Sequence, residues 1–113
     1  MLPPVQLVTT RDRRLEEVVQ RLVAAFEPER IYLFGSAVRG ESGPDSDYDL
    51  MVVVADDAPP ARRRSRLAYE VLWGLGVAAD VLVWTRTGFD SRAHLKASLP
   101  AVILREGRLL HAA

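Results

Sequence analysis

Two short apolar runs joined by a loop rich in glycine and acid constrain this chain more than any other feature. The first run is RIYLFG (residues 30–35) and the second is YDLMVVV (residues 48–54). Both are short and rich in β-branched and aromatic residues, so each predicts a buried strand, the first of which ends at glycine. Three acids lie close together at the start of the second strand: Asp45, Asp47 and Asp49. Like charges this close repel, so such a cluster either splays into water or holds a cation.

Helical and strand-like patterns alternate along the remainder of the chain. Apolar residues spaced three and four apart predict amphipathic helices, and Pro28 closes the first of them. The further elements expected are helices over 12–27 and 61–73, a strand over 79–84, a helix over 92–99 ended by Pro100, a helical continuation over 101–106, and a turn with a short edge strand over 107–111. This order predicts an α/β (α+β) fold, with helices packed on a small mixed β-sheet.

Composition and charge narrow the classes of function. Fifteen Lys and Arg residues balance fifteen Asp and Glu residues, so we expect no direct binding of nucleic acid and no attraction to membranes. Without cysteine there is neither a disulfide nor a thiolate metal site. The 113 residues predict a single domain over 1–113. No basic leader and no long apolar run is found, so we expect a cytoplasmic protein.

The predicted strands bring carboxylates together. Residues two apart share one face of a strand, so Asp47 and Asp49 should project to the same side. Asp80 opens the strand predicted at 79–84, and if the two strands are neighbours, three carboxylates converge at one end of the sheet. Hard oxygen ligands without histidine suit Mg²⁺ or Mn²⁺, and two such ions support in-line phosphoryl or nucleotidyl transfer.

The loop after the first strand supplies candidate phosphate ligands. Gly35 allows a ligand to approach the backbone closely, and Ser36 offers a hydroxyl and a backbone N–H. The residues that follow can start a short helix, and Arg39 is placed to neutralise phosphate charge. The sequence therefore predicts that the glycine-serine turn binds a triphosphate while the aspartates bind its metal ions.

Gly35-Ser36, ten further residues and then Asp47-Tyr48-Asp49, with Asp80 downstream, form a pattern that resembles the DNA polymerase beta-like nucleotidyltransferase superfamily. Within it the chain is similar to the minimal nucleotidyltransferases (MNT), antitoxins encoded beside a helical HEPN-domain toxin. The resemblance implies a palm-like fold, in which Gly35 and Ser36 grip phosphate and the aspartates bind metal. It also implies that Asp80 helps to deprotonate the acceptor hydroxyl, and Arg39 matches a recurring basic position.

The resemblance also implies an activity and a partner. We expect a Mg²⁺- or Mn²⁺-dependent enzyme that transfers a nucleoside monophosphate, most simply AMP from ATP, to a hydroxyl. The implied acceptor is a tyrosine of a HEPN-domain toxin, which the modification would silence. The partners expected are thus this toxin and a nucleoside triphosphate, and a homodimer is compatible with the sequence.

Other interpretations remain open. One is a non-catalytic antitoxin that neutralises its partner by binding, and another is a transferase acting on a small molecule such as an aminoglycoside. An EF-hand loop is disfavoured because Leu50 stands where that loop needs glycine. A solvated acidic turn would explain the aspartates alone, but not their combination with Gly35-Ser36 and Asp80. The basic stretch at 62–66 is either a solvated helix start or a contact for RNA or an acidic partner.

Overall fold

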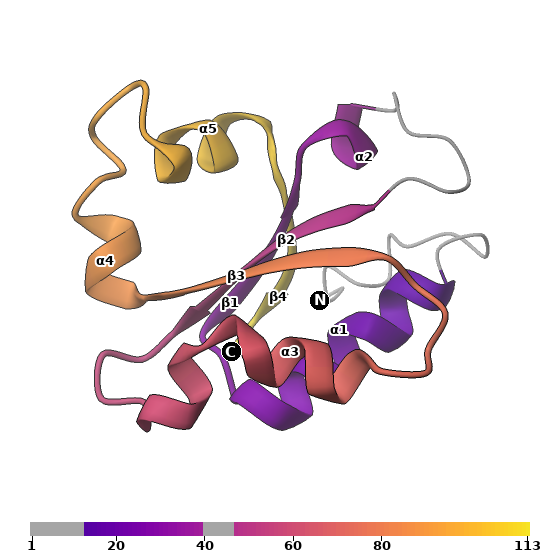
Figure 1. Ribbon diagram of the computed structural model, residues 1–113. Coiled ribbons are helices and arrows are strands. Elements are labelled where there is room, and N and C mark those ends of the chain that lie inside the picture. Colours follow the sequence, from indigo (N-terminus) through magenta and orange to yellow (C-terminus); the bar gives the residue numbers. More distant parts are fainter. Residues whose placement is uncertain (1–12, 40–46) are drawn as a thin grey trace.

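The computed structural model describes residues 13–39 and 47–113, so Asp45 lies outside the described residues. Its strands form one four-stranded sheet in the order β3-β2-β1-β4 (Figure 1). Strand β1 is antiparallel to both β2 and β4, whereas β3 is parallel to β2. The strands are β1 (Arg30–Phe34), β2 (Tyr48–Val54), β3 (Ala79–Thr85) and β4 (Arg108–Ala112). The predicted mixed sheet is confirmed.

Helices cover both faces of this sheet. Helices α1 (Arg13–Phe26) and α3 (Ser65–Leu72) lie on one face, and α4 (Arg86–Asp90) and α5 (Leu99–Glu106) lie on the other (Figure 1). The short helix α2 (Ser36–Arg39) follows β1 directly. The apolar stripe of α1 is buried as its spacing predicts, through Leu15, Val18, Val19, Leu22 and Phe26.

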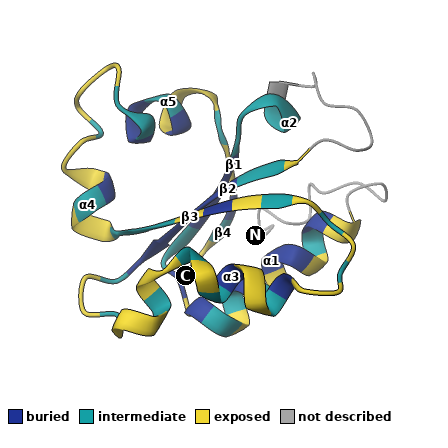
Figure 2. Cartoon of the chain, in the orientation of Figure 1, coloured by how far each residue is buried: buried dark blue, intermediate teal, exposed yellow. Residues whose placement is uncertain are grey.

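Strand β2 lies at the centre of the core and contributes to both layers. Leu50 and Val52 pack in the cluster under α1 and α3, whereas Met51 and Val53 pack with Phe89 of α4 in the cluster on the opposite face. Figure 2 shows this strand buried along most of its length. Burial on both faces explains why its sequence is a continuous apolar run and lacks the alternation of a half-exposed strand.

Two predicted helices differ from the structure. Residues 92–98 form turns, and α5 begins only at Leu99, where the Ser98 side chain caps the helix by accepting a hydrogen bond from the Ala101 N–H at 3.2 Å. Pro100 therefore opens a helix and does not end one, because the first turn needs no N–H donor. The helix predicted over 61–73 is split at Arg64, whose extended backbone separates the 3-10 helix η3 (Pro60–Arg63) from α3.

Helix α4 was not predicted. It is a single turn that follows β3 without a break, and the Thr85 hydroxyl caps it by accepting a hydrogen bond from the Gly88 N–H at 3.1 Å. Five residues are too few to show helical periodicity. No helix within the described ranges combines the length and the apolar character needed to cross a membrane.

Candidate functional site

Two of the predicted carboxylates are neighbours in the sheet. Asp49 is the second residue of β2 and Asp80 the second residue of β3, and the parallel ladder pairs them directly. Residues paired in a parallel ladder point to the same face, and the strands themselves lie about 4.8 Å apart. The condition stated from the sequence, that the two strands are neighbours, is met, so both aspartates lie at one end of the same strand pair.

The end of β1, at Gly35, lies next to the Asp49 carboxylate. Phe34 pairs with Asp49 across the β1–β2 ladder, and Gly35 follows with a φ of 78°. A Cβ atom at Gly35 would stand 2.4 Å from the Asp49 Oδ2 atom. Only glycine therefore allows both the left-handed backbone and the close approach of this carboxylate. Ser36 and Arg39, the other predicted phosphate ligands, are the first and last residues of α2.

A tyrosine of helix α3 contacts one of the two paired aspartates. The Tyr69 hydroxyl, carried by α3, donates a hydrogen bond of 3.3 Å to the Asp80 Oδ1 atom. Desolvation and the charge of the Asp80 carboxylate raise the pKa of Tyr69 above its ordinary value. No ion pair involving Asp80 occurs among the side chains that the structure describes. The hydrogen-bond donor to Asp80 is therefore a neutral hydroxyl group.

Sequence reasoning missed Tyr69. It lies eleven residues before Asp80 and is separated from it by the turn that carries Gly74 and Gly76. A tyrosine on an amphipathic helix gives no local signal of a contact with a strand end. Only the packing of α3 against β3 creates the contact.

The chemistry of the donors fits a hard divalent cation. Asp49 and Asp80 offer carboxylate oxygens on one face, and a shared Mg²⁺ would offset the repulsion between two carboxylates on adjacent strands. Asp47 is exposed and immediately precedes β2. Within residues 13–39 and 47–113, no cluster of three or more His, Cys, Asp or Glu side chains is arranged to hold a metal ion. The pair thus fits the cation, and the contribution of Asp47 stays a prediction.

The basic stretch at 62–66 is partly engaged in local contacts. Arg62 forms an ion pair with Glu27 of the loop after α1, and Arg66 lies 3.7 Å from Glu70 one turn further along α3. These two arginines therefore contact different acids of the same chain. Exposed pairs of this kind contribute about 0–1 kcal/mol each.

Comparisons with known proteins agree with this geometry. The family model described as "Nucleotidyltransferase domain" matches residues 13–110. A crystal structure of a toxin-antitoxin with AMP-PNP is 25% identical, with a TM-score of 0.57, and the match covers 87% of this chain and 73% of that one. A mutant of the toxin-antitoxin MntA-HpeT is 21% identical, with the same TM-score and coverage of 87% and 72%, and shows the likeness of fold. No curated protein matched the chain.

Proposed function

This chain belongs to the nucleotidyltransferase domain family, and we propose that it transfers AMP from ATP to a tyrosine hydroxyl of a HEPN-domain toxin and thereby acts as an antitoxin. The observation that carries the proposal is the direct pairing of Asp49 with Asp80 beside Gly35. Three strands contribute to this one corner of the sheet, so residues distant in the sequence serve a single reaction centre.

Each residue has a distinct role in the proposed reaction. The Gly35-Ser36 turn binds the phosphate chain through backbone N–H groups and the serine hydroxyl, because no Cβ at position 35 blocks the approach. Arg39 neutralises phosphate charge. Asp80 accepts the proton of the attacking hydroxyl, and its carboxylate has no arginine among the described side chains to compete for that role.

Asp47, Asp49 and Asp80 would hold Mg²⁺ or Mn²⁺. When bound, the ion supplies charge stabilisation for the phosphate oxygens and for the pyrophosphate that leaves. The carboxylates themselves set the position of the reacting phosphate relative to the acceptor, since both paired aspartates are fixed by the β2–β3 ladder. This rigid placement favours the in-line geometry on which transfer depends.

Two observations support the partner and the nucleotide. The similar toxin-antitoxin was crystallised with AMP-PNP, an analogue of ATP. The site also lies at an open strand end, with Asp47 and Asp80 both exposed, so a hydroxyl presented by another protein can reach it. In the proposed reaction, a partner protein presents its acceptor hydroxyl at this open strand end.

The test is the intact mass of the HEPN-domain protein encoded beside this chain, after incubation with this chain, ATP and Mg²⁺. The expected result is a gain of one or more AMP units on that protein. The double variant Asp47→Ala, Asp49→Ala should give none, whereas Asp57→Asn, which removes an exposed acid at the other end of β2, should retain the full gain. A stable complex without any mass gain would support neutralisation by binding and contradict the transferase.

A further inference from the structure

The Tyr69 hydroxyl occupies a position that the proposed reaction assigns to an acceptor. It donates its hydrogen bond to the Asp80 Oδ1 atom at 3.3 Å, and Asp80 is the carboxylate proposed to take the proton of the attacking hydroxyl. A general base must lie within hydrogen-bonding reach of the proton it removes. Tyr69 already meets this condition within the same chain.

The order of groups across the sheet agrees with this position. Gly35 follows β1, Asp49 stands on β2, Asp80 stands on β3, and β3 is the last strand on its side of the described sheet. Tyr69 contacts Asp80 from α3, the helix whose Ala68 and Leu72 pack on one face of the sheet. In the order of the strands, the two carboxylates therefore lie between the phosphate-binding turn after β1 and the β3 side that the tyrosine contacts.

We propose that Tyr69 is an internal acceptor and that this chain nucleotidylates its hydroxyl. This inference rests on the proposed function. The Tyr69 oxygen attacks the α-phosphorus of a nucleoside triphosphate and forms a phosphodiester. The bond between the α-phosphorus and the bridging oxygen of the β-phosphate breaks, and pyrophosphate leaves with that electron pair. The phenolic proton passes to Asp80.

The three tyrosines of the chain differ in the way this step requires. Tyr69 is 51% exposed, so its ring is accessible to a nucleotide. Tyr32 is buried and stacks on Phe89, with ring centroids 5.4 Å apart. Tyr48 packs against the cluster under α1 and α3, on the face opposite to Asp49. The Tyr69 hydroxyl donates a hydrogen bond to Asp80, a carboxylate of the candidate site.

The experiment incubates the full chain with ATP and Mg²⁺, first alone and then with the HEPN-domain protein, and maps AMP by peptide mass spectrometry. The expected result is AMP on the peptide that carries Tyr69 when the chain is alone. Tyr69→Phe keeps the ring and should lose this label, and Tyr48→Phe is the matched control that should keep it. Asp80→Asn should slow labelling by about 10²–10⁴-fold, the usual effect of removing a general base.

Each outcome has one meaning for the two proposals. Label on the HEPN-domain protein without any on Tyr69 overturns self-modification and leaves the transferase standing. Label that persists on this chain in Tyr69→Phe also overturns the assignment to Tyr69. No label on either protein overturns both proposals. Melting temperatures of the variants, matched to that of the parent chain, establish that a lost label reflects a lost hydroxyl and not a loss of fold.

Discussion

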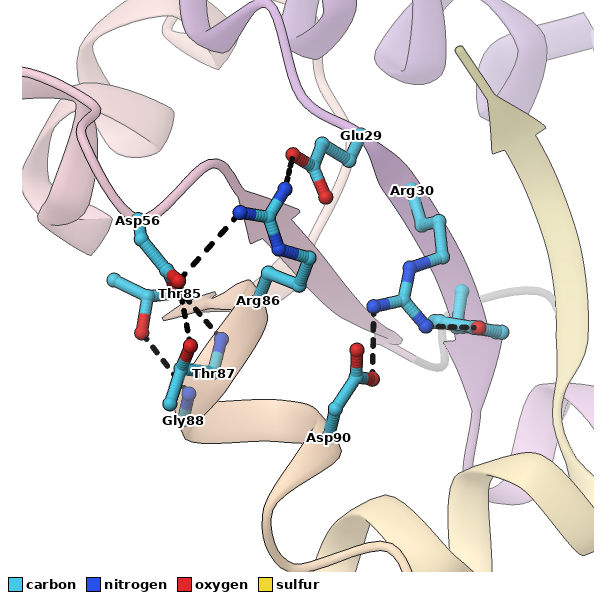
Figure 3. Close-up of polar contacts among 9 residues, drawn as sticks. Glu29, Arg30, Asp56, Thr85, Arg86, Thr87, Gly88 and Asp90 are labelled. Carbon is cyan, nitrogen blue, oxygen red and sulfur yellow. Dashed lines mark hydrogen bonds and ion pairs between the residues drawn. The ribbon is translucent and has the colours of Figure 1, made fainter.

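The two ends of the β2–β3 strand pair treat their acidic residues in opposite ways. Beyond the carboxyl ends of these strands, Asp56 accepts a hydrogen bond from the Thr87 N–H at 2.8 Å and another from the Thr87 hydroxyl (Figure 3). Arg86 lies between Asp56, at 3.6 Å, and Glu29, with which it also pairs. At the amino ends, Asp80 receives a hydrogen bond from the neutral Tyr69 hydroxyl.

The acids at the carboxyl ends hold local structure, whereas the proposed function assigns the acids at the amino ends to a ligand. Arg30 donates a hydrogen bond to Asp90 at 2.9 Å and lies over the ring of Phe89, so arginines reinforce the contact of α4 with the sheet (Figure 3). Carboxylates with cationic partners need no further ion. Two carboxylates paired on adjacent strands repel each other, and a bound cation would offset that repulsion.

The largest effect on activity is expected from Asp80→Asn. The amide keeps an oxygen that accepts the Tyr69 hydrogen bond but cannot take a proton, so transfer to the partner should fall by about 10²–10⁴-fold. The residue is exposed, so its stability effect should stay within about 0.5 kcal/mol. Initial rates of AMP transfer and urea unfolding measure the two effects. A large fall in stability would show that Asp80 holds the fold, and would end the contrast between the two strand ends.

The largest effect on stability is expected from Phe89→Ala, at the opposite end. Phe89 of α4 is fully buried against the sheet and stacks on Tyr32, so the loss of its ring should cost about 3–5 kcal/mol of folding stability. Urea unfolding with a linear extrapolation measures the loss. At a temperature where the variant is still folded, its rate of AMP transfer should remain close to that of the parent chain. A selective loss of transfer would contradict the separation of the two ends.

Gly35→Ala should lower both the folding stability and the rate of AMP transfer. Gly74→Ala is its matched control. Both glycines have positive φ, so each alanine should cost about 1–2 kcal/mol of strain. Nothing lies within 4 Å of a Cβ at Gly74, whereas a Cβ at Gly35 meets the Asp49 carboxylate. Only Gly35→Ala should therefore lose AMP transfer. Equal transfer by the two variants would show that the close approach of Gly35 to Asp49 is not needed.

The smallest effect is expected from Asp56→Asn, and it depends on pH. Hydrogen bonds from the Thr87 hydroxyl and N–H, helped by Arg86, lower the pKa of Asp56 below its ordinary value of 3.8. The ionised form is thus favoured by folding, and this stability is present above pH 3.8 and lost as pH falls through the lowered pKa. The parent chain should melt slightly above Asp56→Asn at neutral pH, and the gap should close in acid. Thermal scans across pH measure it, and a gap that widens in acid would reverse the assigned sign.

Prediction from the sequence was accurate for the strands but failed for a helix in the last third of the chain. The run at 48–54 matched β2 to the residue because a strand buried on both faces needs an unbroken apolar run. The helix predicted over 92–99 was wrong, since Ser98 and Pro100 are helix-start signals and α5 begins at Leu99. A proline is compatible with either end of a helix, and the cap at Ser98 places Pro100 in the first turn.

For the candidate site, the sequence supplied the residue types and the structure supplied their neighbours. Asp49 and Asp80 were identified by their places at the starts of predicted strands, but their pairing depends on a parallel ladder between segments thirty residues apart. The Tyr69 hydrogen bond had no sequence signal, because it depends on how α3 packs against β3. Likewise the contacts of Arg86 join the first residue of α4 to Glu29 before β1 and Asp56 after β2.

The sequence by itself determined the four strands, the first long helix and the chemistry available to them. Apolar periodicity, glycine and the placement of acids are local properties, and glycine at position 35 permits the positive φ that the structure adopts there. The tertiary structure alone decided which acids meet arginines and which meet a hydroxyl. That choice depends on distances between strands and helices far apart in the chain, and electrostatic interactions are set by those distances and by burial.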